Sequence, residues 1–489
     1  MCSHVENVKR KMQSPSNPLL NSLFSSSQTL GTKPLLNFNL RPRMGGQVSH
    51  PMPSYQLQKL FPPSDKFPSQ SVNISPRTSL NNTPICSPIR KFSENTESFP
   101  MSYSQAKKLF KNKLTKWELD EINSYNIVYC IGLEAEKIKP NSNFRNNFGF
   151  DDEKGKYLVV LKDHIAYRYE VCEVYGNGTF GIVVKALDMM LNMYVALKII
   201  DKKSNVGEEI QILQYLKEKN DKGLYGVVDY MGSFTFREHQ IIVFEVLCIN
   251  LYDFLKQSNF EGVNLSLIRR IASQILQTLN FIHRNNVIHC DLKPENVLFK
   301  ELNRSVVKLV DFGTSCFIGR HIFTYIQSRY YRAPEIILGL KYTSAIDIWS
   351  LGCILAELYR GLPIFAGENE QDQLFAIMEF LGPPPPDLLI QSPKKKAYFD
   401  DNFEVKAIKT CKNGPRKPSA KSIPGFLRDA EVGFINLVTR CLEIDPRKRI
   451  SAQEALEDPW LMDFTMKPVI TRKDSIIKRN FSLNLRGRT

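Results

Sequence analysis

Short apolar runs rich in β-branched residues dominate the chain between Tyr169 and Leu247. The segments at residues 195–200 and 240–247 are examples, and runs of this length and composition predict buried strands. One helical pattern interrupts them around Glu208–Leu216, where apolar residues recur at intervals of three. The pattern therefore predicts a small strand-rich lobe that carries a single helix.

Beyond Leu251 the apolar runs lengthen and acquire helical spacing, as at residues 267–283 and 345–361. Strands followed by helices, rather than alternating with them, indicate an α+β arrangement. We therefore predict a small sheet lobe followed by a larger helical lobe. The chain contains no internal repeat.

The sequence before these lobes consists of two segments of different composition. Residues 1–100 hold 17 Ser and 13 of the 28 Pro, and they lack long apolar runs. Such a segment cannot bury enough surface to offset its ordering entropy, so we expect disorder over residues 1–103. From Ser104 the spacing of apolar residues (Leu109, Leu114, Trp117 and Ile122) suits an amphipathic helical segment.

Two strands are predicted after this segment, at residues 156–161 and 167–176, beyond a polar loop at residues 141–147. The Ser-Pro and Thr-Pro steps of the tail are candidate sites for proline-directed phosphorylation, although Pro-rich linkers produce such pairs by chance. They begin at Ser14, Ser75, Thr83 and Ser87.

The formal net charge is +15, which raises nucleic acid as a partner. Residues 1–100 contribute 11 basic against 4 acidic residues, and residues 459–489 contribute seven against two. Basic arms on a nearly balanced core are more often solvated or partner-docking segments than sequence-reading surfaces. We therefore expect no specific nucleic-acid binding.

Ten cysteines are scattered without a C-x-x-C pair, which argues against a disulfide framework and a zinc ribbon. The N-terminus has no apolar signal region, and no apolar run is long enough to span a bilayer. We expect a cytoplasmic protein with no membrane span. The nucleus stays an open alternative, because the basic clusters at residues 9–11, 472–473 and 478–479 are too short to establish an import signal.

The first chemical motif is a G-x-G-x-x-G turn formed by Gly176, Gly178 and Gly181. Glycines let the backbone fold closely over phosphates and present its N–H groups to them. The motif alone also fits a dinucleotide-binding turn, but that alternative needs a helix directly afterwards. Here the strand-like residues 182–189 follow instead.

Lys198 lies in an apolar strand-like run, and a partly buried ammonium needs an anionic partner. Glu209, on the predicted helix, can supply one and hold the amine against nucleotide phosphates.

A polar segment at residues 288–296 combines three groups of matched chemistry. Asp291 can accept or orient the proton of an attacking hydroxyl, and Lys293 can lie near the transferred phosphoryl group. Asn296 can bind Mg²⁺ through its amide oxygen, and Asp311, after the next apolar strand, can complete the oxygen site. A plain polar turn is the alternative, but nine specified residues make it a poor one.

Three further segments follow in a specific order and spacing, namely residues 333–335 (Ala-Pro-Glu), residues 347–352 and residues 445–449. Together with the motifs above, they make residues 169–462 resemble the eukaryotic protein kinases.

The resemblance narrows to the dual-specificity tyrosine-regulated (DYRK) kinases of the CMGC group. Cys290 in the His-Cys-Asp triplet, the run at residues 250–253 and the segment at residues 325–335 resemble that family. Residues 151–170 are similar to its DH box, and residues 105–132 to the accessory region of its second class. With these blocks the similarity covers about 360 residues.

This resemblance implies a bilobal kinase fold with four parts: the tail at residues 1–103, an accessory region at 104–168, the kinase domain at 169–463 and a basic tail at 464–489. The lobes would meet after Leu247, and residues 382–425 would form an insert. The insert either docks partners or is a solvated loop, and neither is favoured.

The resemblance also assigns site residues. Those for ATP are Tyr175, Gly176, Gly178, Gly181, Val183, Ala196, Lys198, Glu209, Phe244 (gatekeeper), Glu245 and Leu247 (hinge), and Leu298. Those for catalysis and Mg²⁺ are Asp291, Lys293, Asn296 and Asp311. Structural roles fall to an ion pair between Glu335 and Arg449, and to Asp347 beneath the catalytic loop.

Regulation and substrates follow from the same resemblance. Tyr325 is the candidate autophosphorylated tyrosine, with Arg329 and Arg332 as partners for its phosphate. The substrates would be Ser/Thr residues of proteins with proline downstream, and Glu295 would pair with an upstream arginine. Regulatory partners would bind through the tails and the insert.

Three departures from the family pattern stand out. Phe323 replaces the first tyrosine of the usual Tyr-x-Tyr, and Tyr175 stands where Leu or Ile is usual. Lys198 and Glu209 are only 11 residues apart, with Gly207 near the expected helix start, so we expect a late-starting helix. The alternative to an active kinase is a pseudokinase scaffold that binds partners through its tails.

Overall fold

The computed structural model describes residues 99–141, 146–178, 181–202, 206–301, 305–320, 325–406 and 416–462. By internal contacts the chain falls into two units, Met1–Ile89 and Arg90–Thr489, and every described residue lies in the second. The expected tails therefore lie outside the described residues, apart from residues 99–103, and so do the four phosphorylation candidates of the N-terminal tail. Phe323 and the middle of the insert, residues 407–415, are also outside them.

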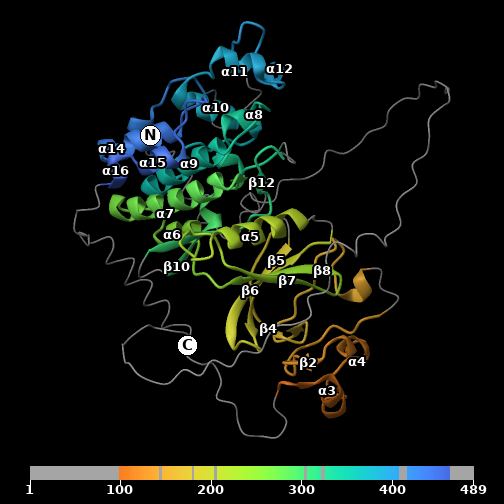
Figure 1. The fold of residues 1–489 in the computed structure, drawn as a ribbon. Coiled ribbons are helices and arrows are strands. Elements are labelled where there is room, and N and C mark those ends of the chain that lie inside the picture. Colours follow the sequence, from red (N-terminus) through yellow and green to blue (C-terminus); the bar gives the residue numbers. More distant parts are fainter. Residues whose placement is uncertain are drawn as a thin grey trace, which may run out of the picture. The chain divides into compact units, whose positions relative to one another are not determined.

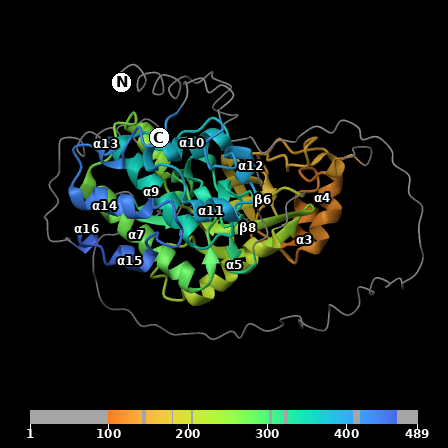
Figure 2. The ribbon, with the colours of Figure 1, turned by 90° about the horizontal axis from the view of Figure 1, so that it is seen from above.

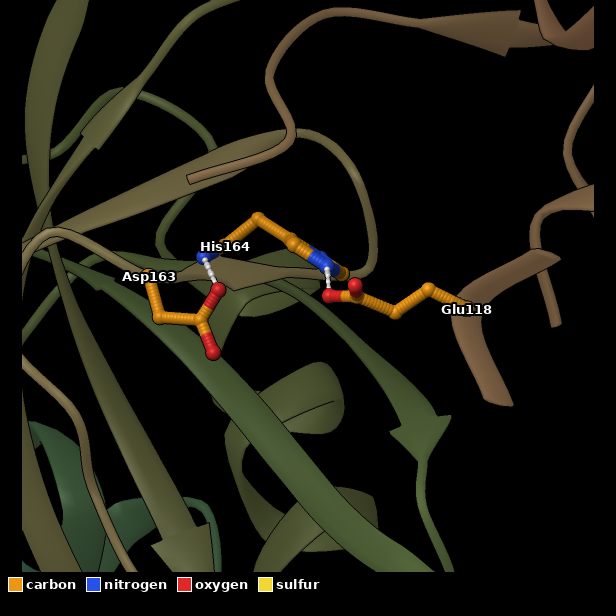
Figure 3. Close-up of side chains that lie close together, drawn as sticks. All are labelled: Glu118, Asp163 and His164. Carbon is orange, nitrogen blue, oxygen red and sulfur yellow. Dashed lines mark hydrogen bonds and ion pairs between the residues drawn. The ribbon is translucent and has the colours of Figure 1, made fainter. Parts of the chain in front are cut away.

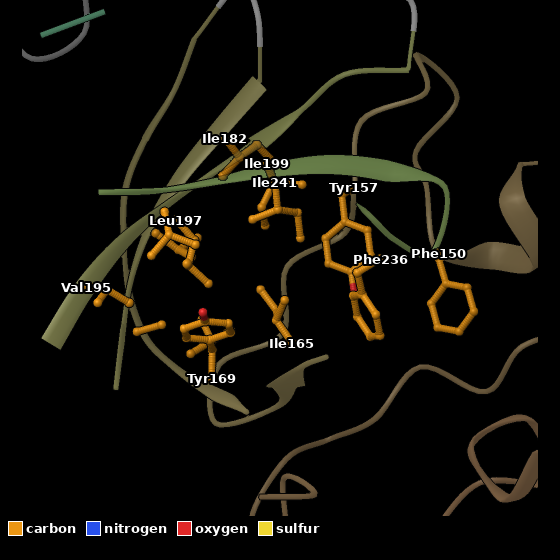
Figure 4. Packing of buried hydrophobic residues seen from close by; sticks show 14 residues of the cluster. Phe150, Tyr157, Ile165, Tyr169, Ile182, Val195, Leu197, Ile199, Phe236 and Ile241 are labelled. Carbon is orange, nitrogen blue, oxygen red and sulfur yellow. The ribbon is translucent and has the colours of Figure 1, made fainter. Parts of the chain in front are cut away.

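A six-stranded antiparallel sheet forms the smaller lobe, with strand order β3-β4-β5-β6-β8-β7 (Figure 1). Its strands are β3 (His164–Ile165), β4 (Tyr169–Asn177), β5 (Gly181–Asp188), β6 (Met193–Ile200), β7 (Tyr230–Phe236) and β8 (His239–Glu245). β-Branched residues on these strands bury one face in a core that includes Val184, Leu197 and Ile199 (Figure 4).

The alternation of side chains along β6 determines what the opposite face presents. Leu197 and Ile199 point into the core, so Ala196 and Lys198 point to the other side. In the register, Val183 pairs with Lys198 and Phe244 pairs with Ala196. Because directly paired residues share a face, these four side chains lie on the same surface of the sheet.

The helix α5 (Gly207–Lys219) packs beside this sheet, as the sequence pattern predicts. It begins at Gly207, so Glu209 lies in its first turn together with Glu208. Acidic groups there interact favourably with the helix dipole. The glycine therefore does not delay the helix beyond Glu209, and the expected late start is wrong.

Helices dominate the larger lobe (Figure 2). They are α6 (Leu251–Gln257), α7 (Leu265–Arg284), α8 (Pro334–Ile337), α9 (Ala345–Arg360), α10 (Glu370–Leu381), α11 (Pro386–Gln391), α12 (Lys395–Tyr398), α13 (Ile423–Phe426), α14 (Val432–Cys441), α15 (Ala452–Leu456) and α16 (Pro459–Met462). α7 buries one apolar stripe, whereas α9 is buried along most of its length. Gly361, with φ +74°, ends α9 in the left-handed region.

Short strands position the chemistry between the lobes. They are β9 (Val287–Ile288), β10 (Val297–Glu301), β11 (Val306–Leu309) and β12 (Cys316–Phe317). β10 pairs with β11 and β9 with β12, both antiparallel. The segment between β9 and β10 and the residues directly after β11 therefore lie at neighbouring strand ends.

The accessory region contains two helices, α3 (Tyr103–Leu109) and α4 (Lys116–Glu121), where the sequence suggests one helical segment. Ser102 and Thr115 each begin a helix with a complete capping box, and the second cap explains the interruption. A strand pair forms between β1 (Met101–Ser102) and β2 (Ile127–Val128), so the ordered region begins before the expected boundary at residue 104. Two short 3₁₀ helices, at Ile122–Ser124 and Asn147–Gly149, complete the region.

The expected strand at residues 156–161 does not form. Only Tyr157 makes a bridge there, to Asp151, and the following residues are irregular. By contrast, β4 confirms the strand expected around residues 167–176.

A buried cluster joins the accessory region to the sheet (Figure 3). Glu118 Oε1 lies 2.9 Å from His164 Nε2, and both oxygens of Glu118 accept hydrogen bonds of 2.9 Å from Lys137. Asp163 accepts from the backbone N–H of His164 at 2.8 Å. Although three potential ligands converge here, the lysine neutralises the carboxylate that a cation would need, so we interpret the cluster as a structural link.

No helix among the described residues combines the length and the hydrophobicity that a membrane crossing requires.

Candidate active site

The glycine-rich turn joins β4 to β5, and a strand follows it as expected, which excludes the dinucleotide-binding alternative. Gly181 has φ +147°, and a Cβ atom there would lie 2.0 Å from the carbonyl oxygen of Ile199. A Cβ atom on Gly176 would meet nothing within 4 Å. Gly181 is therefore required by the fold, whereas Gly176 leaves open space beside the turn.

Lys198 lies between two carboxylates. Its Nζ is 2.6 Å from Glu209 Oε1 and 2.8 Å from Asp311 Oδ1. Burial lowers the pKa of Lys198, but the two anions outweigh burial and hold that pKa above its usual value. Burial likewise raises the pKa of Asp311, and attraction to Lys198 overcomes it, bringing that pKa to about 2. Lys198 and Asp311 are thus charged at neutral pH, whereas burial raises the pKa of Glu209 against the attraction of Lys198.

Asp291 is held by several donors in the loop between β9 and β10. Its Oδ2 lies 2.6 Å from Lys293 Nζ, and its Oδ1 accepts from both the N–H and the hydroxyl of Ser328 at 2.8 Å. Attraction to Asp291 raises the pKa of Lys293 despite the opposing effect of burial. These contacts fix the carboxylate in one orientation.

The residues expected to hold Mg²⁺ fit an oxygen-ligated cation. Asn296 donates its Nδ2 to the carbonyl of Asp291 at 2.8 Å, which leaves the Oδ1 of that amide as the potential ligand. Asp311 is ionised and has φ +62°. A Cβ atom on Gly313 would lie within 3.3–3.4 Å of Asp311, Glu209 and Lys198, so glycine gives this crowded charged cluster its room.

The expected adenine-binding residues line the lobes on both sides. Ala196 and Phe244 are buried on the face of the sheet that carries Lys198, and Val183 is half-buried beside them. Leu298 bridges to Asn250, which brings β10 beneath the end of the hinge.

Tyr175 lies at a register shift between β4 and β5, so it is not directly paired in the ladder. It is 44% exposed. Partial burial raises its pKa to about 12, with smaller contributions from Glu173 and then Cys248.

Tyr325 is 54% exposed, and the guanidinium of Arg332 stacks on its ring at 3.9 Å from the centroid. Arg329 instead donates to the carbonyl of Glu368 at 2.7 Å. Of the two expected phosphate partners, only Arg332 contacts the unmodified tyrosine in the described part of the chain.

Two supporting contacts match their expected geometry. Glu335 and Arg449 form a fully buried pair with bonds of 2.6 and 2.9 Å. Asp347 accepts the backbone N–H groups of His289 and Cys290 at 2.9 and 3.0 Å. Asp347 therefore fixes the loop that carries Asp291.

Several residues of the site escaped sequence reasoning. Ser328 lies within the recognised segment, but nothing in the motif shows that its hydroxyl reaches Asp291. Gln327 has φ +63°, a left-handed backbone conformation that a glutamine in the sequence does not predict. Glu357 is buried and accepts from Tyr331 at 2.7 Å, and its only signal is a charged residue inside an apolar helix.

Comparisons with known proteins agree with this geometry. The protein kinase domain family matches residues 169–461. The chain is 44% identical over 370 residues to dual specificity tyrosine-phosphorylation-regulated kinase 2 of Drosophila melanogaster, covering 74% of this chain and 51% of that protein. It therefore spans about half the length of that relative.

Two other relatives are matched over more of their length. Dual specificity tyrosine-phosphorylation-regulated kinase 3 of Rattus norvegicus is 42% identical over 399 residues, covering 77% of this chain and 68% of that protein. Dual specificity tyrosine-phosphorylation-regulated kinase 4 of Homo sapiens is 43% identical over 365 residues, covering 74% of this chain and 70% of that protein.

Proposed function

Because this chain belongs to the dual-specificity tyrosine-phosphorylation-regulated kinase family of the CMGC group, we propose that it transfers the γ-phosphoryl group of ATP to Ser/Thr residues of proteins. The observation that carries the proposal is the continuous charged array of Lys198, Glu209 and Asp311, next to an oriented Asp291. Protein kinases use ATP with Mg²⁺, and this array supplies the groups that such a substrate needs.

Phosphoryl transfer requires positioning and charge stabilisation more than covalent chemistry. Bound Mg²⁺ would neutralise phosphate charge, held by Asn296 and Asp311. Lys198 would bind phosphate oxygens while Glu209 keeps its amine in place. Asp291 would orient the substrate hydroxyl and accept its proton, and Lys293 would stabilise charge on the transferred group.

We propose that Tyr325 is autophosphorylated. Its ring is more than half exposed, so its hydroxyl is accessible for modification. A phosphotyrosine carries close to two negative charges. The neighbouring guanidinium of Arg332 could then form a charge-assisted pair with the phosphate in place of its contact with the ring.

A preference for proline after the target residue is supported by the backbone of Gln327. Its carbonyl accepts from Nε and Nη2 of Arg332, at 3.2 and 2.8 Å. That carbonyl is therefore unavailable to the N–H of a substrate residue passing this turn. Proline has no N–H, so it loses nothing there.

A preference for an upstream arginine is supported by two neighbouring carboxyl groups. Glu295 Oε2 is buried and has no hydrogen-bond partner among the described residues. Glu357, close enough to interact with it, is buried without an ion pair in the described part of the chain. A guanidinium from the substrate would offset the free-energy cost of burying these two carboxyl groups without an ion pair, and it would bind both of them.

A peptide series tests these proposals together. A peptide with Arg upstream and Pro downstream of a serine should be phosphorylated best, and replacing either residue with Ala should lower kcat/KM about tenfold or more. Asp291→Asn should abolish incorporation. Mass spectrometry of bacterially expressed protein should find phosphate on Tyr325. Activity that survives Asp291→Asn would contradict the assignment.

No observation favours the pseudokinase alternative, because every residue expected to act in phosphoryl transfer is present. Lys198 contacts both Glu209 and Asp311, and Asp291 contacts Lys293 and Asn296. Regulatory partners through the tails and insert stay a prediction.

A further inference from the structure

A buried lysine three residues before Asp311 joins the hinge to the strand that precedes the proposed metal-binding carboxylate. Lys308, on β11, contacts Glu245 Oε1 and lies 3.2 Å from Asp229 Oδ2. Its side chain is only 9% exposed. Glu245 is the first hinge residue, so a single ammonium links residues 63 positions apart.

Backbone bonds tie the same three segments together. The N–H of Leu309 donates to Gly226 at 2.7 Å, and the N–H of Val228 donates to Leu309 at 3.0 Å. The N–H of Glu245 donates to the carbonyl of Asp229 at 3.2 Å. The hinge end of β8, the connection at residues 226–229 and β11 therefore form one hydrogen-bonded wall behind the cleft.

The carboxylate of Glu245 is the anion on which this wall converges. Its Oε1 accepts the N–H of Asp229 at 2.8 Å in addition to Lys308. Its Oε2 lies 3.5 Å from Lys300, whose side chain is 42% exposed. Lys308 is thus the buried partner and Lys300 a weaker, solvent-screened one.

We infer that Lys308 is a positioning residue for ATP: it fixes the hinge, which holds the adenine, at a set separation from Asp311, which holds the metal-bound phosphates. The inference rests on the proposed kinase function for the identity of the ligand. Without Lys308, the hinge carboxylate keeps the N–H of Asp229 but only the exposed Lys300 as a cationic partner, and the hinge gains freedom that nucleotide binding must remove. Peptide binding uses other residues, so its free energy does not include the cost of ordering the hinge.

The test compares Lys308→Met with the matched control Lys300→Met, which removes the exposed lysine from the same carboxylate. We expect Lys308→Met to raise the Kd of the non-hydrolysable analogue AMP-PNP with Mg²⁺, and the KM of ATP, by about fivefold. The KM of the peptide should stay unchanged, and Lys300→Met should alter neither constant by more than about twofold. Lys308→Arg should restore nucleotide affinity.

Equal AMP-PNP affinities in the two methionine variants, or a parallel rise of the ATP and peptide KM values, would overturn the inference. If Lys308→Met does not fold, Glu245→Gln removes the same ion pair from its other end and is judged by the same criterion. Because AMP-PNP binding needs no turnover, a protein that binds nucleotide but phosphorylates nothing would contradict the proposed function and leave this inference standing.

Discussion

Arg237, in the turn between β7 and β8, donates from Nε and Nη2 to both carboxylate oxygens of Glu121, at 3.0 and 2.9 Å. The arginine side chain is only 3% exposed, and its guanidinium also stacks on Phe150 at 4.0 Å. This bidentate ion pair therefore links the accessory region to the outer edge of the sheet.

Replacing Arg237 with Met should therefore destabilise the protein. The change leaves Glu121 buried without its cation, which typically costs about 3–5 kcal/mol. Differential scanning calorimetry should show a melting temperature lower by roughly 5–15 °C. Lys162→Met is the control, because Lys162 and Glu134 form an exposed pair at 4.0 Å, and it should melt like the wild type. Identical melting of Arg237→Met and the control would show that the pair contributes nothing.

Glu209→Gln should lower kcat/KM for peptide phosphorylation roughly 10- to 100-fold without unfolding the protein. The amide cannot neutralise Lys198, which would then be held by Asp311 alone. Glu208→Gln removes the same charge from the same helical turn without touching Lys198 and should retain activity. Steady-state kinetics with circular dichroism on both variants checks this, and equal activity of the two variants is the contrary result.

The stability of the protein should depend on pH through Glu357. Burial, with a smaller contribution from Glu295, raises the pKa of Glu357 to about 8, against the opposing hydrogen bond from Tyr331. The folded protein therefore keeps this proton up to about pH 8, whereas the unfolded chain releases it near the usual value of 4.5. The stabilisation is complete below pH 4.5 and is lost as the pH rises through 8.

Urea unfolding at pH 5.5 and pH 8.5 measures this effect. The wild type should lose more unfolding free energy between the two pH values than Glu357→Gln does, by on the order of 1–3 kcal/mol. Glu261→Gln, at an exposed position, should behave like the wild type. Parallel pH profiles for the wild type and Glu357→Gln would exclude the buried carboxyl as the titrating group.

The two glycines of the phosphate-binding turn should respond differently to alanine. In Gly181→Ala the new methyl group meets the carbonyl of Ile199, so the unfolding free energy should fall by at least about 2 kcal/mol. Gly176→Ala places its methyl group in open space, so stability should be kept while the KM for ATP rises. Thermal melts and ATP titrations distinguish the two, and comparable melting temperatures would show that the strand can shift to admit the methyl group.

Most of the chemistry was predictable from sequence because each motif residue lies next to residues that identify it. Lys198, Glu209, Asp291, Asn296 and Asp311 are all in the expected neighbourhood of one another. The single helix of the smaller lobe and the helical larger lobe were predictable from periodicity.

The remaining features depend on tertiary contacts that no local pattern reveals. The accessory helix is interrupted because Thr115 begins a new helix. Residues 156–161 have no neighbouring strand to pair with among the residues that the structure describes. The ion pair of Lys308 joins segments that are distant in the chain, and Arg329 turns to the carbonyl of Glu368 rather than to Tyr325. The cytoplasmic location and the role of the insert stay predictions.

Arg332 makes two kinds of contact: its guanidinium stacks on the ring of Tyr325, and it also donates hydrogen bonds to the carbonyl of Gln327. If Tyr325 is autophosphorylated and proline follows the target residue, as proposed above, both properties depend on the side chain of Arg332. Under these two proposals, a substitution of this arginine would remove the partner of the phosphotyrosine and weaken the preference for proline at the same time.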